Sequence, residues 1–205
     1  MTRFFKLVLL CLFASPLNAG DAGLYPEAID PDAGFLRVLM TGSGFVNIAG
    51  KSHRIDAPGL SPFHILPSGR TEIAWAEGQT WVDLPSGRHV SLLIRDGGQA
   101  EAVEDPIANH PAKADVTLIN LSDVEGLALF VPQAKTEVFT DVAPDKFATR
   151  AVRAPLTLDF EFRASDRTLA VLSGVDLARK SGVTFLLTGS GGDYTAQALA
   201  NRYER

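Results

Sequence analysis

Short apolar runs, each bounded by turn-forming residues, dominate the chain from Phe35 onward. Thr, Val, Ile and Phe are frequent inside the runs, and Gly, Pro, Asp and Ser lie between them, which is a pattern typical of β-strands. Successive runs start roughly ten residues apart, the spacing of β-sandwiches and small barrels. No window carries the periodicity of an amphipathic helix. The pattern therefore predicts an all-β protein.

The predicted strands fall into two groups. In the first half they cover residues 35–40, 45–49, 62–66, 71–75, 80–84, 89–94 and 100–103. In the second half they cover residues 116–121, 127–131, 136–139, 156–162, 168–172 and 183–187. A last short strand is expected near residues 195–203, where the alanine content would also suit a helix.

The two halves are similar to one another. Residues 87–94, followed shortly by an Asp-Gly-Gly turn, are similar to residues 180–187, followed shortly by a Gly-Gly-Asp turn. Residues 35–39 open the first half as residues 116–120 open the second. We therefore predict two tandem antiparallel β-sandwich domains related by internal duplication, with convergent strand patterns as the alternative.

The N-terminus has the features of a secretory signal peptide. Arg3 and Lys6 precede an apolar run at residues 7–13, and small residues follow up to Ala19. The run is far shorter than the roughly 20 residues that span a bilayer. The only cysteine, Cys11, lies in this segment. We expect export to the periplasm.

A proline-containing segment between the halves has the composition of a linker. The expected organisation is a signal peptide at residues 1–19, an N-terminal β-sandwich at 20–105, a linker at 106–113 and a C-terminal β-sandwich at 114–205. The formal net charge is −5. Nucleic-acid binders carry a positive surplus instead, so no nucleic-acid partner is expected.

The sequence offers little catalytic chemistry. The four histidines are scattered, with no His-x-His or His-x-x-x-His spacing, and no metal or cofactor is expected. Ser43 and Ser190 lie in glycine-rich turns that lack the pattern of a nucleophile elbow. No catalytic residue is predicted.

Two tryptophans flank a predicted hairpin turn. A two-residue loop at residues 77–78 would place the indoles of Trp75 and Trp81 on opposite faces, and a three-residue loop would pair them on one face. Only the second arrangement builds a platform for a sugar ring, and core packing of at least one indole is the competing interpretation.

The second half is nearly neutral, and several of its basic residues are close in sequence. An anionic partner would bind there if it binds at all. The candidate residues for contact with a polymer or partner are Trp75, Trp81, Arg150, Arg153, Arg163 and Arg167.

Six segments stand out by their order and spacing: residues 24–26 (Leu-Tyr-Pro), 34–38 (Gly-Phe-Leu-Arg-Val), 63–69, 103–106, 116–123 and 186–191. Taken together, they resemble the AlgF family of alginate biosynthesis proteins. The resemblance implies a periplasmic accessory or adaptor protein needed for the O-acetylation of mannuronate residues in alginate. It implies two kinds of partner, periplasmic SGNH-type acetyltransferases and a membrane-bound O-acyltransferase, and leaves open contact with the polymer.

The resemblance implies no active site, although members of the family are often labelled acetyltransferases. Two alternatives to an adaptor remain open. The first is a polysaccharide-binding β-sandwich module, and the second is an acetyltransferase subunit with its own catalysis through Ser43 or Ser190.

Overall fold

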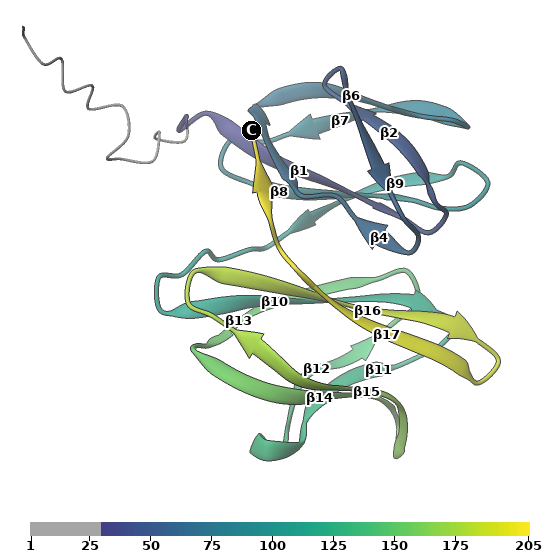
Figure 1. The fold of residues 1–205 in the computed structure, drawn as a ribbon, viewed down its shortest axis with the longest axis vertical. Helices are drawn as coiled ribbons and strands as arrows, with labels where there is room; N and C mark the ends of the chain where they lie inside the picture. Colours follow the sequence, from purple (N-terminus) through teal and green to yellow (C-terminus); the bar gives the residue numbers. More distant parts are fainter. Residues whose placement is uncertain (1–29) are drawn as a thin grey trace, which may run out of the picture.

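The structure is a computed structural model that describes residues 30–205 (Figure 1). The expected signal peptide, residues 1–19, lies outside the described residues. Residues 30–205 form β-strands and one 3-10 turn, η2 (Pro132–Ala134), which confirms the predicted all-β class. No helix in this range has the length and apolar content needed to cross a membrane.

The first sandwich consists of two sheets. The first inner sheet contains β1 (Ala33–Met40), β4 (Gly59–Leu60), β5 (Phe63–Pro67), β8 (His89–Ile94), β9 (Ala100–Asp105) and β18 (Tyr203–Glu204). The first outer sheet contains β2 (Gly44–Ile48), β3 (Lys51–Ile55), β6 (Gly69–Trp75) and β7 (Gly78–Leu84). The strand orders are β18-β5-β1-β8-β9, with β4 beside β1, and β3-β2-β6-β7.

The second sandwich repeats this plan. Its inner sheet contains β10 (Lys113–Ser122), β13 (Phe147–Arg153), β16 (Ser181–Ser190) and β17 (Asp193–Ala200). Its outer sheet contains β11 (Leu127–Val131), β12 (Thr136–Val142), β14 (Leu156–Ala164) and β15 (Arg167–Leu177). The strand orders are β13-β10-β16-β17 and β12-β11-β14-β15.

The two sandwiches share one topology. Matched in chain order, β1, β2, β3 and β5–β9 have the same neighbours as β10–β17. The similar sequence segments take equivalent places, since β1 corresponds to β10 and β8 to β16. Strand β1 pairs in parallel with β8, and β10 pairs in parallel with β16, at the centre of mainly antiparallel sheets. The sequence pattern did not predict this parallel pairing. A shared topology is what internal duplication requires, and the duplication itself stays a prediction.

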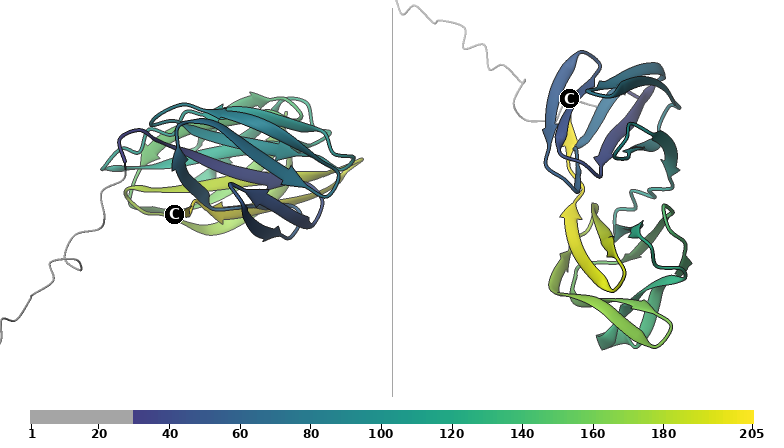
Figure 2. Two further views of the ribbon diagram at one scale, coloured as in Figure 1. Left: turned by 90° about the horizontal axis from the view of Figure 1, so that it is seen from above. Right: turned by 90° about the vertical axis from the view of Figure 1, so that its right-hand side faces the viewer.

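The four sheets stack as four layers, with the two inner sheets in contact (Figures 1 and 2). Each sandwich has its own apolar core, and a third cluster joins the inner sheets through Leu39, Leu93, Ile119 and Leu186, all buried. Both faces of an inner sheet are therefore covered. This explains why β8 is buried at every position.

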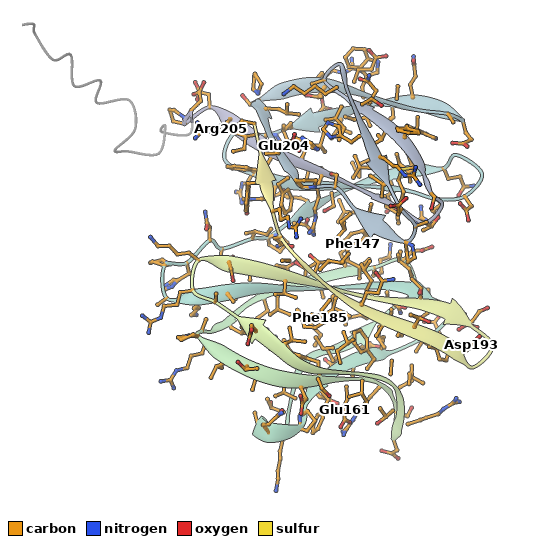
Figure 3. All side chains as sticks on the ribbon, viewed as in Figure 1. Phe147, Glu161, Phe185, Asp193, Glu204 and Arg205 are labelled. Carbon is orange, nitrogen blue, oxygen red and sulfur yellow. The ribbon has the colours of Figure 1, made fainter. Side chains whose placement is uncertain are left out.

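The second core is built around aromatic rings. Phe185 on β16 is fully buried, with its ring centroid 4.5 Å from that of Phe160 and 6.2 Å from that of Phe162. Figure 3 shows Phe185 inside the second sandwich and Phe147 near the contact between the inner sheets.

Most predicted strands are present, and the differences lie at sheet edges. β3 and β13 were not predicted, because they are edge strands with few buried positions. The segment at residues 193–200 is a strand, so the helical alternative is wrong there. The last strand, β18, leaves the second sandwich and pairs in parallel with β5 of the first.

Replacement of Phe185 by alanine tests the second core. Removing a fully buried ring costs about 3–5 kcal/mol because a cavity remains among the other aromatic side chains. Urea unfolding followed by circular dichroism measures the loss. Phe45→Ala is the control, since Phe45 is 61% exposed; an equal effect of the two substitutions would contradict the assigned core.

Candidate functional site

Arg37 lies on β1 at the contact between the two inner sheets, and only 1% of its surface is exposed. Its Nε donates to the Ser91 hydroxyl at 2.6 Å, and its Nη2 donates to the Asp105 carboxylate at 2.9 Å. Its Nη1 donates to the second sandwich, to the Thr184 hydroxyl at 2.7 Å and the Asn201 side-chain carbonyl at 3.1 Å. One guanidinium therefore bonds to both sandwiches.

Two neighbours of Arg37, Asp105 and Phe63, favour the charged form of its buried guanidinium. Burial lowers the pKa of Arg37, and the adjacent Asp105 carboxylate opposes that shift. The guanidinium carbon also lies 4.5 Å from the ring centroid of Phe63, which is within cation–π range. A buried ion pair of this kind adds little net stability compared with well-packed apolar side chains of similar volume.

An aromatic cluster continues the same face of the first inner sheet. The rings of Phe35 and His89 stack with centroids 4.2 Å apart, and the rings of Phe63 and Tyr203 stack with centroids 5.4 Å apart. His89 Nε2 lies 3.0 Å from the Tyr203 hydroxyl. These contacts hold β18 against the first sandwich.

Two groups in this cluster have shifted pKa values. Burial and then the charge of Arg37 lower the pKa of His89 to about 4. Burial and then the charge of Asp115 raise the pKa of Tyr203 to about 12. Both side chains are therefore neutral near neutral pH, mainly because burial disfavours their charged forms.

The segment that joins the sandwiches, residues 106–113, is hydrogen-bonded to the second sandwich. The Asp115 carboxylate on β10 accepts hydrogen bonds from the backbone N–H groups of Ala108 at 3.1 Å and Asn109 at 2.9 Å. The predicted linker at residues 106–113 is thus bonded to the start of the second sandwich.

A pocket of about 360 Å³ opens at the junction of the two sandwiches. Residues 58–63 of the first sandwich line one side, and residues 199–202 line the other. Asp56, Gln197 and Arg202 add polar groups of both charges. The arrangement suits a polar segment or ligand, and it makes the junction the candidate functional site.

Comparisons with known proteins identify the family. A family model described as "Alginate O-acetyl transferase AlgF" matches residues 7–184. The chain belongs to the AlgF family. This confirms the resemblance found in the sequence.

Named members of the AlgF family cover nearly the whole chain. The alginate biosynthesis protein AlgF of Pseudomonas aeruginosa is 27% identical over 194 residues, which is 93% of this chain and 89% of the relative. AlgF of Azotobacter vinelandii is 28% identical over 175 residues, which is 84% of this chain and 80% of the relative. A solved structure of the C-terminal domain of AlgF from P. aeruginosa is 30% identical, with a TM-score of 0.39, and covers 44% of this chain and 99% of that domain.

The two tryptophans lie on opposite faces of the first outer sheet. The turn at residues 76–77 pairs Trp75 with Gly78, and Trp81 lies opposite Glu72. Trp75 packs against the first core, whereas Trp81 is 51% exposed with Arg70 5.2 Å from its ring. The loop has two residues but lies one position earlier than residues 77–78, and the indoles lie on opposite faces with Trp75 packed against the core. No shared aromatic platform results.

The four candidate arginines do not share one sheet. Arg150 and Arg153 are exposed on β13 of the second inner sheet. Arg163 on β14 bonds to Glu161 and stacks over Phe130, with the guanidinium carbon 3.5 Å from the ring centroid. Arg167 begins β15 and is exposed. Their binding role stays a prediction.

Sequence reasoning missed the junction residues Arg37, Asp105 and Tyr203. One signal was available, because the strand that carries Arg37 is apolar at both alternating sets of positions and so predicts burial on both faces. A charged residue in such a strand needs a buried partner. No local pattern names Asp105 as that partner.

Of the two turn serines considered from the sequence, Ser43 accepts a hydrogen bond from the Ala57 backbone N–H at 2.8 Å.

Arg37→Met tests the junction. The variant leaves Asp105 buried without its cation, which costs about 3–5 kcal/mol of unfolding free energy. Arg37→Met combined with Asp105→Leu removes both charges and should recover most of the loss. Arg54→Met is the control because its ion pair with Asp56 is exposed. A loss in Arg37→Met no larger than in the control would contradict the assigned network.

His89 predicts a pH dependence of stability. A histidine whose pKa is lowered by folding stabilises the protein fully above about pH 6.5, and this contribution is lost as the pH falls towards 4. Burial also lowers the pKa of His64, which acts in the same direction. We expect the unfolding free energy to decrease from about pH 7 to about pH 4, and less steeply in His89→Gln. Urea titrations measure both slopes, and an unchanged slope in His89→Gln would refute the assignment.

Proposed function

We propose that this chain is a non-catalytic adaptor of alginate O-acetylation in the periplasm. The family match and the names of the relatives support a role in alginate biosynthesis. The adaptor role rests on one structural observation: two different outer faces point away from each other at opposite ends of one stack of sheets (Figures 1 and 2). Such a body can hold two partners at a fixed separation.

The first outer face carries exposed apolar side chains. Trp81 on β7 is 51% exposed, and Phe45 on β2 is 61% exposed. Arg70 lies over the Trp81 ring. Tryptophan and arginine are the residues most enriched among the energetically dominant positions of protein interfaces. This face therefore suits a protein partner.

The second outer face has a different chemistry. Arg163 and Glu161 form an ion pair over Phe130, and Val171 opposite Glu161 is 54% exposed. Figure 3 places Glu161 at the end of the molecule far from the first sandwich. Two faces of unlike chemistry suit two unlike partners, a membrane-bound O-acyltransferase and a periplasmic SGNH-type acetyltransferase.

The chemical advantage of an adaptor is proximity. Acetyl transfer from a membrane donor to a polymer requires the donor, the transferase and the polymer to meet. Binding two of them on one body converts a chance encounter into an intramolecular one with a high effective concentration. No bond needs to form or break on the adaptor.

Direct polymer binding is a second candidate, favoured by the exposed Trp81 with its neighbouring Arg70. An indole face stacks on sugar rings and a guanidinium pairs with uronate carboxylates. Titration with mannuronate oligomers, followed by tryptophan fluorescence, separates the two functions. A change that is lost in Trp81→Ala supports polymer binding.

Co-purification with the two partners tests the adaptor. The chain should retain both the SGNH-type acetyltransferase and the detergent-solubilised O-acyltransferase. Trp81→Ala should lower recovery of one partner about fivefold or more, and Val171→Asp recovery of the other, because each removes an exposed interface residue. Gln99→Ala, in the exposed turn between β8 and β9, is the control.

Three results would count against the adaptor. The first is no retention of either partner at low salt. The second is equal recovery of both partners with Trp81→Ala, Val171→Asp and the control Gln99→Ala. The third is acetyl-ester turnover by the isolated chain that disappears in Ser43→Ala or Ser190→Ala, which would establish catalysis instead.

A further inference from the structure

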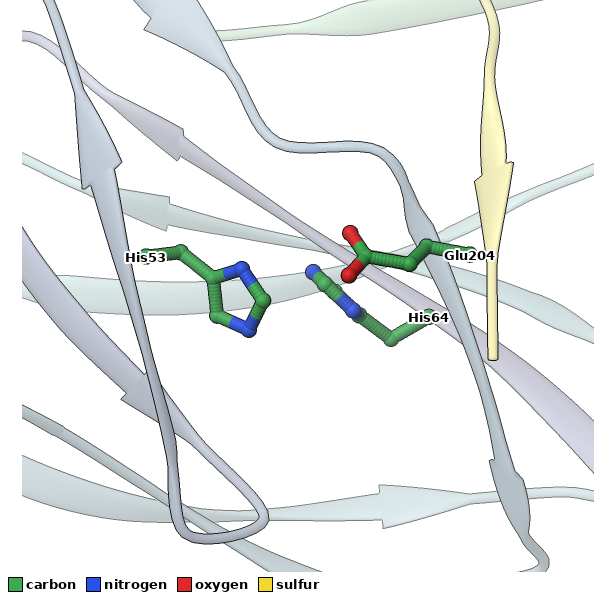
Figure 4. Close-up of side chains that lie close together, drawn as sticks. All are labelled: His53, His64 and Glu204. Atoms are coloured by element: carbon green, nitrogen blue, oxygen red, sulfur yellow. The ribbon is translucent and has the colours of Figure 1, made fainter.

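We propose that His53, His64 and Glu204 form a binding site for a divalent transition-metal ion of the zinc class. The ligand atoms of these three residues all lie within 4.8 Å of one another (Figure 4). The two histidine rings are neighbours, with centroids 4.3 Å apart and ring planes tilted by 54° to one another. The site is independent of the proposed adaptor function and lies at the edge of the first sandwich.

Three strands supply the three ligands. His53 is on β3 of the first outer sheet and His64 is on β5 of the first inner sheet. Glu204 is on β18, directly opposite His64 in the parallel pair. The two sheets and strand β18 therefore converge on one point, although Glu204 is far from the two histidines in sequence.

One ring nitrogen of each histidine is buried and unpaired. His64 is only 5% exposed, and within residues 30–205 the Nε2 atoms of both His64 and His53 are buried without a hydrogen bond. An unpaired buried polar atom costs about 1–3 kcal/mol. Two such atoms side by side are unusual in a stable fold. A bound cation would satisfy the lone pairs of both rings at once.

The donor set selects the kind of metal. Two imidazole nitrogens and one carboxylate oxygen bind Zn²⁺, Cu²⁺, Ni²⁺ and Co²⁺, whereas Ca²⁺ and Mg²⁺ prefer oxygen ligands alone. Tetrahedral zinc needs neighbouring ligand atoms about 3.4 Å apart, given zinc–ligand distances of about 2.1 Å. Glu204 is exposed, so its side chain has room to rotate towards the two imidazoles. Water would complete the coordination.

The charged residues around the site predict how substitutions should change its metal affinity. Glu204 attracts a cation, and Lys51 on β3 opposes one. The Lys51 ammonium donates a hydrogen bond to the backbone carbonyl of Arg205 at 3.3 Å, next to Glu204. Removing the lysine charge should therefore strengthen metal binding, whereas removing the glutamate charge should weaken it.

Zinc titration by calorimetry, in a buffer that does not chelate metal, tests the site. The metal-free protein should bind one Zn²⁺ per chain. Affinity should fall about tenfold or more in His53→Gln and in Glu204→Gln, since each removes a ligand. Affinity should rise in Lys51→Gln and stay unchanged in His110→Gln, which alters an exposed histidine of the connecting segment.

Cobalt gives a second readout. Co²⁺ bound at the site should give the intense visible absorption of four-coordinate cobalt, and Glu204→Gln should lose it. Absence of zinc binding at millimolar concentration would overturn the proposal. Binding that is unaffected in both His53→Gln and Glu204→Gln would overturn it as well, because the ion would then lie elsewhere.

Discussion

The guanidinium of Arg37 is buried between two sheets, where every unbonded N–H would be costly. Its acceptors come from both sandwiches: Ser91 and Asp105 from the first, Thr184 and Asn201 from the second. The apolar contacts at the junction give attraction without direction. The hydrogen bonds add direction, since sliding one sheet over the other would break the bonds from Arg37 to Thr184 and Asn201 and leave its buried N–H groups unpaired. Two modules of the same topology are thereby held in one orientation.

The sequence was sufficient for the class and for most strands, because the buried strands carry continuous apolar runs. It was insufficient at the edges, where β3 has only Ile55 buried and β13 has no fully buried residue. Hairpin register was equally difficult. The turn at residues 76–77 decides that Trp75 points into the core and Trp81 away from it, and a shift of one residue would reverse a tryptophan.

The candidate sites depend on contacts between distant segments, which local patterns do not encode. His53 and His64 are separated by a turn and the short strand β4, and they meet only because two sheets face each other. Glu204 joins them only because β18 pairs with β5. The same parallel pairing brings Tyr203 to His89. The candidate arginines show the converse, since closeness in sequence left them on different sheets.

The return of β18 to the first sandwich also affects the order of events during synthesis. The first sandwich is made early, yet within residues 30–205 the side of β5 that faces away from β1 pairs with residues 203–204, which are made last. An uncovered strand edge is prone to pair with other chains. The first inner sheet therefore cannot be completed until the whole second module has been synthesised.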